Sequence, residues 1–135
     1  MTHGIIVPDH MRGLVDGGRY APAVRVGDDV HISGQVGREA DMVAVTSSLE
    51  DHITAAFENL RAVVEAAGGT CADIYELTTY HVDLAEQMPT FAAVKARYFS
   101  DPATLPAWTA VGVAALNSPD FLVEIAARAH VPARN

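Results

Sequence analysis

Apolar and polar positions alternate most clearly in the C-terminal third of the chain. Two apolar runs, residues 106–116 and 121–129, flank the turn-forming residues 117–120, and this pattern predicts a β-hairpin. In the second run, period-two alternation places on one face the side chains of Phe121, Val123, Ile125 and Ala127. Glu124 falls on the other face, so we expect a carboxylate in the middle of an otherwise apolar strand.

The first of these runs carries a large aromatic residue followed by small ones. One face of the predicted strand holds Trp108, Ala110, Gly112 and Ala114. Small residues beside a bulky ring leave room for a ligand or for a neighbouring subunit. We therefore expect the chemistry of this protein to lie near Trp108 and Glu124.

An earlier hairpin is predicted between residues 20–26 and 30–36, closed at the turn-forming pair Gly27–Asp28. Gly34 interrupts its second strand, and a glycine at such a position suggests a β-bulge or the close approach of another group. Before this hairpin, the sequence predicts a short strand and then a loop, at residues 5–7 and 8–19.

One long amphipathic helix is the clearest helical prediction. Ser47 and Glu50 have the spacing of a capping box, and Gly68–Gly69 provides the expected stop. Between them, apolar residues recur at intervals of three and four positions: Ile53, Ala56, Phe57, Leu60, Val63, Val64 and Ala67.

The next segment is predicted to contain a strand, a loop and a second helix. Residues 74–82 are β-prone, and residues 83–87 are typical of a loop. Pro89 suits the first turn of a helix that Asp101–Pro102 ends. Two helices against a mostly antiparallel sheet give an α+β fold of two layers. The length fits one domain, so we expect residues 1–135 to form a single domain.

Composition narrows the classes of function. The net charge is −8 and Lys95 is the only lysine, which disfavours nucleic acids and anionic membrane surfaces as partners because both require basic patches. The lone Cys71 excludes an internal disulfide and fits a reducing compartment. Residues 1–8 lack the features of a signal peptide, and no apolar run reaches the length of a membrane span, so we expect a cytoplasmic location.

No cofactor or metal ion is expected from the sequence. His31 and His81 lie on separate predicted strands, and neither has a second ligand at metal-binding spacing, so we interpret both as structural histidines. Cys71 follows a Gly-Gly turn without an obvious activating neighbour, which argues against a nucleophilic cysteine.

Five short motifs give the chain a resemblance to the Rid family, the reactive-intermediate deaminases also called YjgF-like proteins. In chain order they are Gly18–Val24 (G-x-Y-x-x-A-V), Ser33–Gln35 (S-G-Q), Asn59–Gly68 (N-L-x-x-x-x-x-A-A-G), Pro106–Ala107 and Val123–Ile125. The resemblance covers roughly residues 18–130. It implies a chorismate-mutase-like fold with a six-stranded sheet. It also implies a homotrimer whose three sheets form a central barrel, with a small-molecule cleft between subunits.

The same resemblance implies the residues of the site. Glu124 matches the family's acidic residue, which positions or activates the water that attacks an imine carbon. The substrate-binding positions that it implies are Tyr20, Ser33, Gly34, Trp108, Thr109 and Ala110. An alternative interpretation makes Glu124 a strand residue paired with a neighbouring arginine. Trp108 is either a cleft wall that stacks on a flat ligand or a plug that fills the cleft.

The chain departs from the Rid pattern at the position that binds the carboxylate of the substrate. Deaminating members have the motif P-A-R-[ST], in which the arginine binds the carboxylate of a 2-imino acid. This chain has Trp108 at the position of that arginine. An indole offers one neutral donor, and loss of a buried guanidinium–carboxylate pair typically costs about 2–5 kcal/mol. Arg38 and Arg128 are candidate substitutes, although neither matches a family motif. Lys95 stands where the family helix usually carries Asn.

Two classes of function follow from these residues. The first is a hydrolase or deaminase of small imines or related metabolites, which uses Glu124 and water. The alternative is a trimeric, non-catalytic module that binds a small metabolite. Some Rid relatives are described as endoribonucleases, but the acidic charge balance makes this the third choice.

Overall fold

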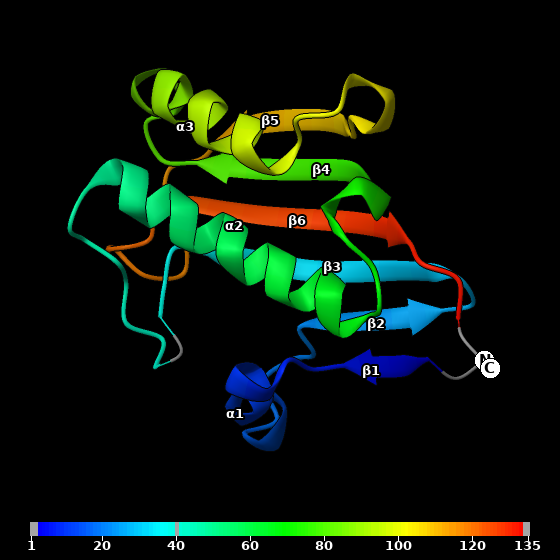
Figure 1. Cartoon of the computed structure of the whole chain (residues 1–135). Helices are drawn as coiled ribbons and strands as arrows, with labels where there is room; N and C mark the ends of the chain where they lie inside the picture. The colour runs from blue at the N-terminus through cyan, green and yellow to red at the C-terminus, as the bar shows by residue number, and fades with distance from the viewer. Residues whose placement is uncertain (1–2, 40, 134–135) are drawn as a thin grey trace.

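Six strands form one sheet in the computed structural model, which describes residues 3–39 and 41–133. In the order β1-β2-β3-β6-β4-β5 across the sheet, every neighbouring pair is antiparallel except β4 and β5 (Figure 1). The strands are β1 (Gly4–Ile6), β2 (Ala23–Val26), β3 (Asp29–Val36), β4 (Ile74–His81), β5 (Ala107–Gly112) and β6 (Val123–His130).

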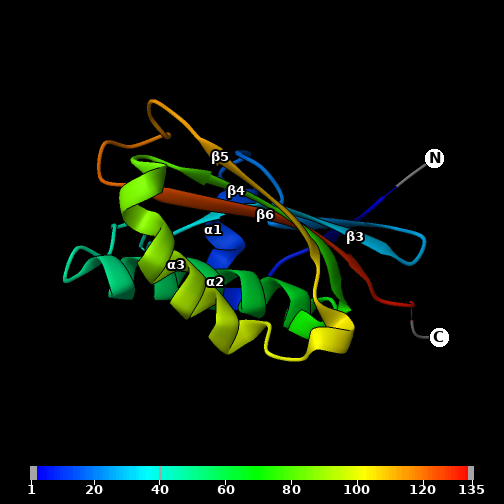
Figure 2. The ribbon, with the colours of Figure 1, turned by 90° about the horizontal axis from the view of Figure 1, so that it is seen from above.

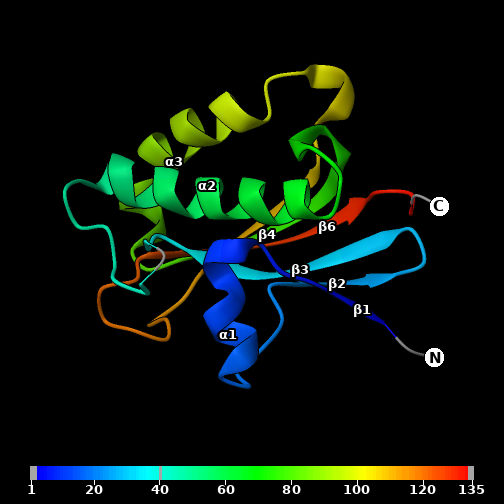
Figure 3. The same ribbon diagram turned by 60° about the horizontal axis from the view of Figure 1, so that its bottom comes forward.

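Two long helices, α2 (Leu49–Ala66) and α3 (Leu84–Tyr98), cover one face of the sheet and leave the other face open (Figure 2). Figure 3 shows α2 running beside α3, and α2 also contacts β3 and β6. This arrangement confirms the predicted two-layer α+β fold with a mostly antiparallel six-stranded sheet. Among the described residues, no helix combines the length and the apolar character needed to cross a bilayer.

The helix α2 confirms the apolar stripe that the sequence predicts. Its residues from Ile53 to Val64 at the predicted spacings are buried between the sheet and α3. The cap is Ser48 rather than Ser47, because the Ser48 hydroxyl accepts the Asp51 N–H at 3.0 Å. Ser47 instead donates its hydroxyl hydrogen to the Asp51 carboxylate.

The first predicted hairpin and its bulge are both confirmed. β2 pairs with β3 around a two-residue turn, in which Gly27 has the positive φ of 62° that such turns need. The pairing of β3 with β6 then shifts register between Ile32 and Gln35, so that Ser33 and Gly34 form a bulge.

The second predicted hairpin is wrong. β5 and β6 are separate strands with β4 between them, and β5 pairs in parallel with β4. The crossover through α3 makes this parallel pairing possible, while β6 finds two eight-residue partners in β3 and β4. Alternation within a strand fixes its buried face but does not identify its neighbours.

Two segments predicted as loops contain helical structure: residues 8–19, and residues 83–87, where α3 begins. Within residues 8–19, a 3-10 turn at Asp9–Met11 leads into α1 (Arg12–Asp16), near the β1 edge of the sheet (Figure 1). Met11 and Leu14 anchor this segment because both are buried in the main core. The loop prediction relied on the local preferences of Gly, Asp and Arg, which do not take into account the burial of Met11 and Leu14 in the core.

The start and the end of α3 also differ from the prediction. The helix begins at Leu84, after Asp83 at a φ of 60°, so Pro89 lies inside the helix rather than in its first turn. The buried Gln87 donates its side-chain amide to the Val82 carbonyl and so holds the turn before the helix in place. The helix therefore starts five residues before Pro89, the residue that was expected in its first turn. The helix ends at Tyr98, before the predicted stop.

Candidate functional site

Glu124 is the second residue of β6 and lies on the open face of the sheet, opposite Val36 of β3 and Tyr80 of β4. Its side chain is half-buried, and burial raises the pKa of its carboxyl above the ordinary value of 4.5. No neighbouring charge or hydrogen bond contributes to this shift. Arg128, four residues along the same face, lies 3.6 Å from the Glu76 carboxylate instead. The structure therefore does not pair Glu124 with Arg128.

The bulge in β3 makes room for the Glu124 side chain. A Cβ atom at Gly34 would lie 2.5 Å from Cδ of Glu124 and 2.8 Å from its Oε2. Atoms do not approach that closely without a shift, so only glycine allows this arrangement. The close approach that the sequence suggests at Gly34 is thus made by the predicted catalytic carboxylate.

Glu124 borders a partly open cavity of about 390 Å³. Four of the seven predicted site residues line it: Tyr20, Ser33, Gly34 and Glu124. The other lining residues were not predicted, namely Val36, Met42, Asn117 and Phe121. Asn117 and Phe121 come from the segment that leads into β6. Their closeness to Glu124 in the sequence is the only feature from which their place in this cavity could have been predicted.

Hydrogen bonds fix the wall of this cavity that carries Tyr20. The Ser33 hydroxyl donates to the Ala21 carbonyl at 2.6 Å, and the Ser33 N–H donates to the Pro22 carbonyl at 2.9 Å. The loop before β2 is therefore tied to the bulge of β3. Tyr20 stands at the mouth of the cavity with 42% of its surface exposed.

The other three predicted site residues lie on β5, which is two strands away from Glu124 in the same chain. Thr109 is opposite Thr78 on the open face, whereas Trp108 and Ala110 are on the helix-covered face. The structure thus divides the predicted site into a Glu124 cavity and a separate β5 group. No side chain of the β5 group lines the Glu124 cavity.

Trp108 packs against α3. Its indole N–H donates to the Thr79 hydroxyl at 2.9 Å, and its ring stacks on Phe91 with centroids 5.8 Å apart. Lys95 places its Nζ 4.5 Å from the centre of the Trp108 ring, within the range of a cation–π interaction. Burial lowers the pKa of Lys95. Within one chain, therefore, Trp108 does not plug the Glu124 cavity.

His81 has the structural role that the sequence predicts, whereas the role of His31 stays a prediction. His81 is fully buried between the Thr79 hydroxyl, 2.7 Å from Nε2, and the Gln87 side chain, 3.0 Å from Nδ1. Burial lowers the pKa of His81, which therefore favours the neutral imidazole. Among residues 3–39 and 41–133, no three His, Cys, Asp or Glu side chains are grouped as metal ligands.

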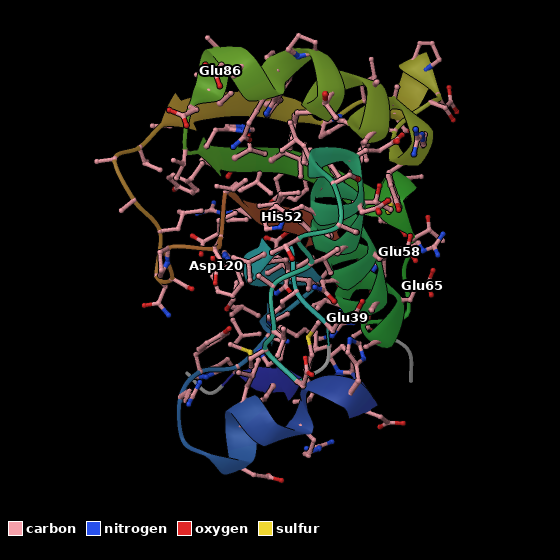
Figure 4. The ribbon with its side chains drawn as sticks, turned by 90° about the vertical axis from the view of Figure 1, so that its left-hand side faces the viewer. Glu39, His52, Glu58, Glu65, Glu86 and Asp120 are labelled. Carbon is pink, nitrogen blue, oxygen red and sulfur yellow. The ribbon has the colours of Figure 1, made fainter. Side chains whose placement is uncertain are left out.

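His52 is a positioning residue that the sequence did not reveal. Its Nε2 accepts the Leu122 N–H at 3.1 Å, which requires Nδ1 to donate to the Val45 carbonyl at 2.8 Å. Figure 4 shows His52 on the side of α2 that faces the sheet. Because Leu122 is two residues before Glu124, this bond fixes the entry into β6 beside the cavity.

Comparisons with known proteins agree with the fold and the motif order. A family model described as Endoribonuclease L-PSP matches residues 14–131. The RutC family protein YjgH of Escherichia coli K12 is 40% identical over 110 residues, or 82% of each chain. A 2-iminobutanoate/2-iminopropanoate deaminase of Dermatophagoides farinae is 36% identical over 102 residues, or 73% of this chain and 76% of that protein. A solved structure of protein YjgH has a TM-score of 0.89 at 35% identity, covering 99% of this chain and 100% of the other.

Proposed function

The chain belongs to the Endoribonuclease L-PSP family, which includes RutC family proteins, and we propose that it hydrolyses small imines with Glu124 and a water molecule. The half-buried Glu124, with its raised pKa and its open cavity, is the observation that carries this proposal. A carboxylate shielded from water and free of a salt bridge is a stronger base than an exposed one. Relatives named 2-iminobutanoate/2-iminopropanoate deaminase indicate the class of substrate.

The reaction needs one water molecule and one base. Glu124 takes a proton from water as the water oxygen bonds to the imine carbon, giving a carbinolamine. The protonated Glu124 then returns the proton to the nitrogen, and its carboxylate accepts the hydroxyl proton of the carbinolamine as the C–N bond breaks. The products are a carbonyl compound and ammonia, and the ammonia leaves as ammonium after taking that last proton from Glu124. The raised pKa suits this cycle, because the same carboxyl group accepts and then gives up the proton.

We further propose that the protein is a homotrimer with the substrate cleft between subunits. Two features support this assembly: the open face of the sheet lacks a covering layer, and β5 is an edge strand (Figure 2). In such a cleft, Trp108, Thr109 and Ala110 of one subunit would complete the Glu124 cavity of the next. Light scattering should give three times the chain mass of 14.3 kDa. A monomer at micromolar concentration would contradict the assembly.

The catalytic proposal is tested by an assay that generates small imines, with and without a carboxylate, in situ with an amine oxidase or an amino-acid oxidase and follows the formation of ammonia or of the carbonyl product. We expect Glu124→Gln to remain folded and to lose about 100-fold or more of the rate, since the amide cannot accept a proton from water. The matched control is Glu76→Gln, which removes a carboxylate on the same face outside the cavity. A Glu124→Gln rate equal to that of the parent would refute the role of Glu124.

A metabolite-binding module remains the second candidate, and the inward packing of Trp108 favours it. The indole N–H is already bonded to Thr79, so nothing at this position offers a charged partner to a carboxylate. This function predicts ligand-dependent thermal stabilisation without turnover. Endoribonuclease activity, suggested by the family description, is disfavoured by the net charge of −8.

A further inference from the structure

Arg38 is buried without a carboxylate partner among residues 3–39 and 41–133. Only 4% of its surface is exposed, and arginine is rarely buried to this extent unless it is paired. Among the described residues, its guanidinium makes one hydrogen bond, from Nη1 to the Glu39 carbonyl at 3.2 Å. None of the salt bridges of the described residues includes Arg38.

The backbone around Arg38 is held firmly in place. The Arg38 N–H donates to the Val36 carbonyl at 2.9 Å, and the Asn59 amide of α2 donates to the Arg38 carbonyl at 3.0 Å. The side chain therefore starts from a fixed point between the end of β3 and α2. In Figure 4 the adjacent Glu39 is seen between α2 and α1.

Arg38 lines two cavities, of about 590 Å³ and about 330 Å³. In the described part of the chain, no buried side-chain nitrogen or oxygen lacks a hydrogen-bond partner. The guanidinium N–H groups for which the described residues offer no acceptor are therefore not sealed in the core, and the cavities that Arg38 lines are the space next to them. A buried, preorganised arginine with free donors is a site for an oxyanion.

The smaller cavity has the right charge and shape for such a ligand. Arg19 and Arg38 line it together with one carboxylate, that of Asp41, whose Oδ1 already accepts the Val43 N–H at 3.0 Å. This gives a local excess of positive charge in a chain of net charge −8. The rest of its wall contains His10, two glycines and the apolar side chains of Met11, Leu14 and Met42.

The larger cavity is less suitable for an anion. Glu39, Asp51 and Glu58 line it, so carboxylates outnumber guanidinium groups there. A negative ligand that enters it would be repelled. The charge balance therefore points to the smaller cavity.

We propose that Arg38 and Arg19 form a second binding site, for a short aliphatic carboxylate, in the cavity between α1 and the loop after β3. The carboxylate group would bind the two guanidinium groups, and its hydrocarbon tail would pack against Met11, Leu14 and Met42. This site goes beyond the proposed imine hydrolysis. Met42 also lines the Glu124 cavity, so the two sites share one wall but have different charged residues.

The first test compares three probes by NMR titration of the whole ¹⁵N-labelled protein: butyrate, its neutral isostere butyramide, and inorganic phosphate. We expect saturable shifts of the amides of Gly13, Gly17 and Arg38 with butyrate, and about tenfold weaker binding of butyramide. Equal binding of butyramide would show that no charge is recognised and would overturn the proposal. Phosphate that binds as tightly as butyrate would also overturn it, since the apolar wall would then contribute nothing.

The second test uses variants. Arg38→Met should weaken butyrate binding about tenfold or more, and Arg38→Lys should weaken it less, because the charge remains but the planar fork is lost. Arg19→Gln should also weaken butyrate binding. Because Arg19 is exposed, this variant should fold, so the test remains decisive even if Arg38→Met does not fold. Arg97→Gln removes an exposed arginine on α3 and should bind as the parent does.

Glu124→Ala distinguishes butyrate binding in the Glu124 cavity from binding at Arg38 and Arg19, because Glu124 lines only the first of these cavities. We expect this variant to bind butyrate as tightly as the parent. If Glu124→Ala abolishes butyrate binding while Arg38→Met and Arg19→Gln leave it intact, the carboxylate occupies the Glu124 cavity and the proposed second site does not exist.

Discussion

Glu124 occupies the space that a side chain at residue 34 would need, because a Cβ atom on Gly34 would lie 2.5 Å from the Glu124 Cδ. The two residues face each other across β3 and β6, at the bulge where the pairing register shifts. The position of the proposed base is therefore coupled to a glycine on another strand. The S-G-Q motif and Glu124 form one structural unit, although they are far apart in the sequence.

We predict that Gly34→Ala displaces the Glu124 carboxylate. The added methyl group cannot fit, so Glu124 must change its rotamer or the bulge must move, at a cost of about 1–3 kcal/mol in the free energy of unfolding. Ligand affinity or turnover should fall together with stability. Urea unfolding and the imine assay measure the two effects. Gly4→Ala, where a Cβ would meet no atom within 4 Å, is the matched control and should change neither.

The buried carboxyl of Glu124 should make stability depend on pH. Its folded-state pKa is raised, so in the range just above its ordinary pKa of 4.5 the folded state binds more protons than the unfolded state. Below the ordinary pKa of 4.5, the carboxyl group is protonated in both states, and burying it costs no charge-related free energy. As pH rises through the folded-state pKa, the cost of burying the charge grows and the free energy of unfolding falls. Glu124→Gln should therefore be more stable than the parent at neutral pH, with the difference vanishing near about pH 4.

Urea unfolding of both proteins across this pH range measures the difference. His81 has a lowered pKa and contributes a slope of the opposite sign, but both proteins contain it and its effect cancels. A constant difference at every pH would show that the carboxyl titrates normally. The rate of imine hydrolysis should rise with pH through a midpoint above 4.5, since only the ionised form acts as the base.

Gln87 should be important for stability. Its amide donates to the Val82 and Leu122 carbonyls, and its oxygen is the partner of His81. We predict that Gln87→Ala lowers the free energy of unfolding by about 2–4 kcal/mol, since several buried polar groups lose their partners. Glu86→Ala, at the adjacent exposed position of α3, is the control and should change stability by less than about 0.5 kcal/mol.

Local patterns predicted most of the elements, but not all of their pairings. The stripe of α2 and the turn at Gly27 were predictable because each depends on residues within a few positions of one another. The false hairpin between residues 106–116 and 121–129 shows the limit of this reasoning. The choice of β4 as the neighbour of both strands depends on the crossover through α3, which no pattern within either strand encodes.

The residues of the candidate site were likewise predictable only in part. Motif resemblance pointed to Tyr20, Ser33, Gly34 and Glu124, which the fold brings to one cavity. Met42 could not be predicted, because it comes from an irregular segment and reaches the cavity with a φ of 70°. The burial of Arg38 likewise depends on tertiary contacts, among them the bond from Asn59 of α2 to the Arg38 carbonyl, and has no periodic signature.

Trp108 and Lys95 lead to the last prediction, which concerns the carboxylate of a 2-imino acid. The parent should deaminate 2-iminopropionate poorly, because position 108 offers no charged partner. Trp108→Arg supplies a guanidinium group, but it also places this group beside the Lys95 ammonium, which lies 4.5 Å from the Trp108 ring centre. Two like charges in a partly buried site repel each other, so the single variant should gain little.

The double variant Trp108→Arg, Lys95→Asn removes that repulsion and should gain tenfold or more in deaminase activity, equivalent to about 1.4 kcal/mol. Its stability cost should stay below the roughly 3–5 kcal/mol of a buried Trp→Ala change, since Trp108 is 37% exposed and arginine retains a long side chain. Lys95→Asn alone is the control and should gain nothing, because it adds no cation. The oxidase-coupled assay compares all four proteins.

A parent that already deaminates as fast as the double variant would mean that another residue binds the carboxylate. Arg38 would then be the first to examine, because its guanidinium borders the neighbouring cavity. A double variant that keeps its fold and its assembly but gains no activity would mean that water activation is missing as well as the charge. The metabolite-binding function would then account better for the half-buried Glu124, because such a carboxylate also recognises a hydrogen-bond donor on a bound ligand.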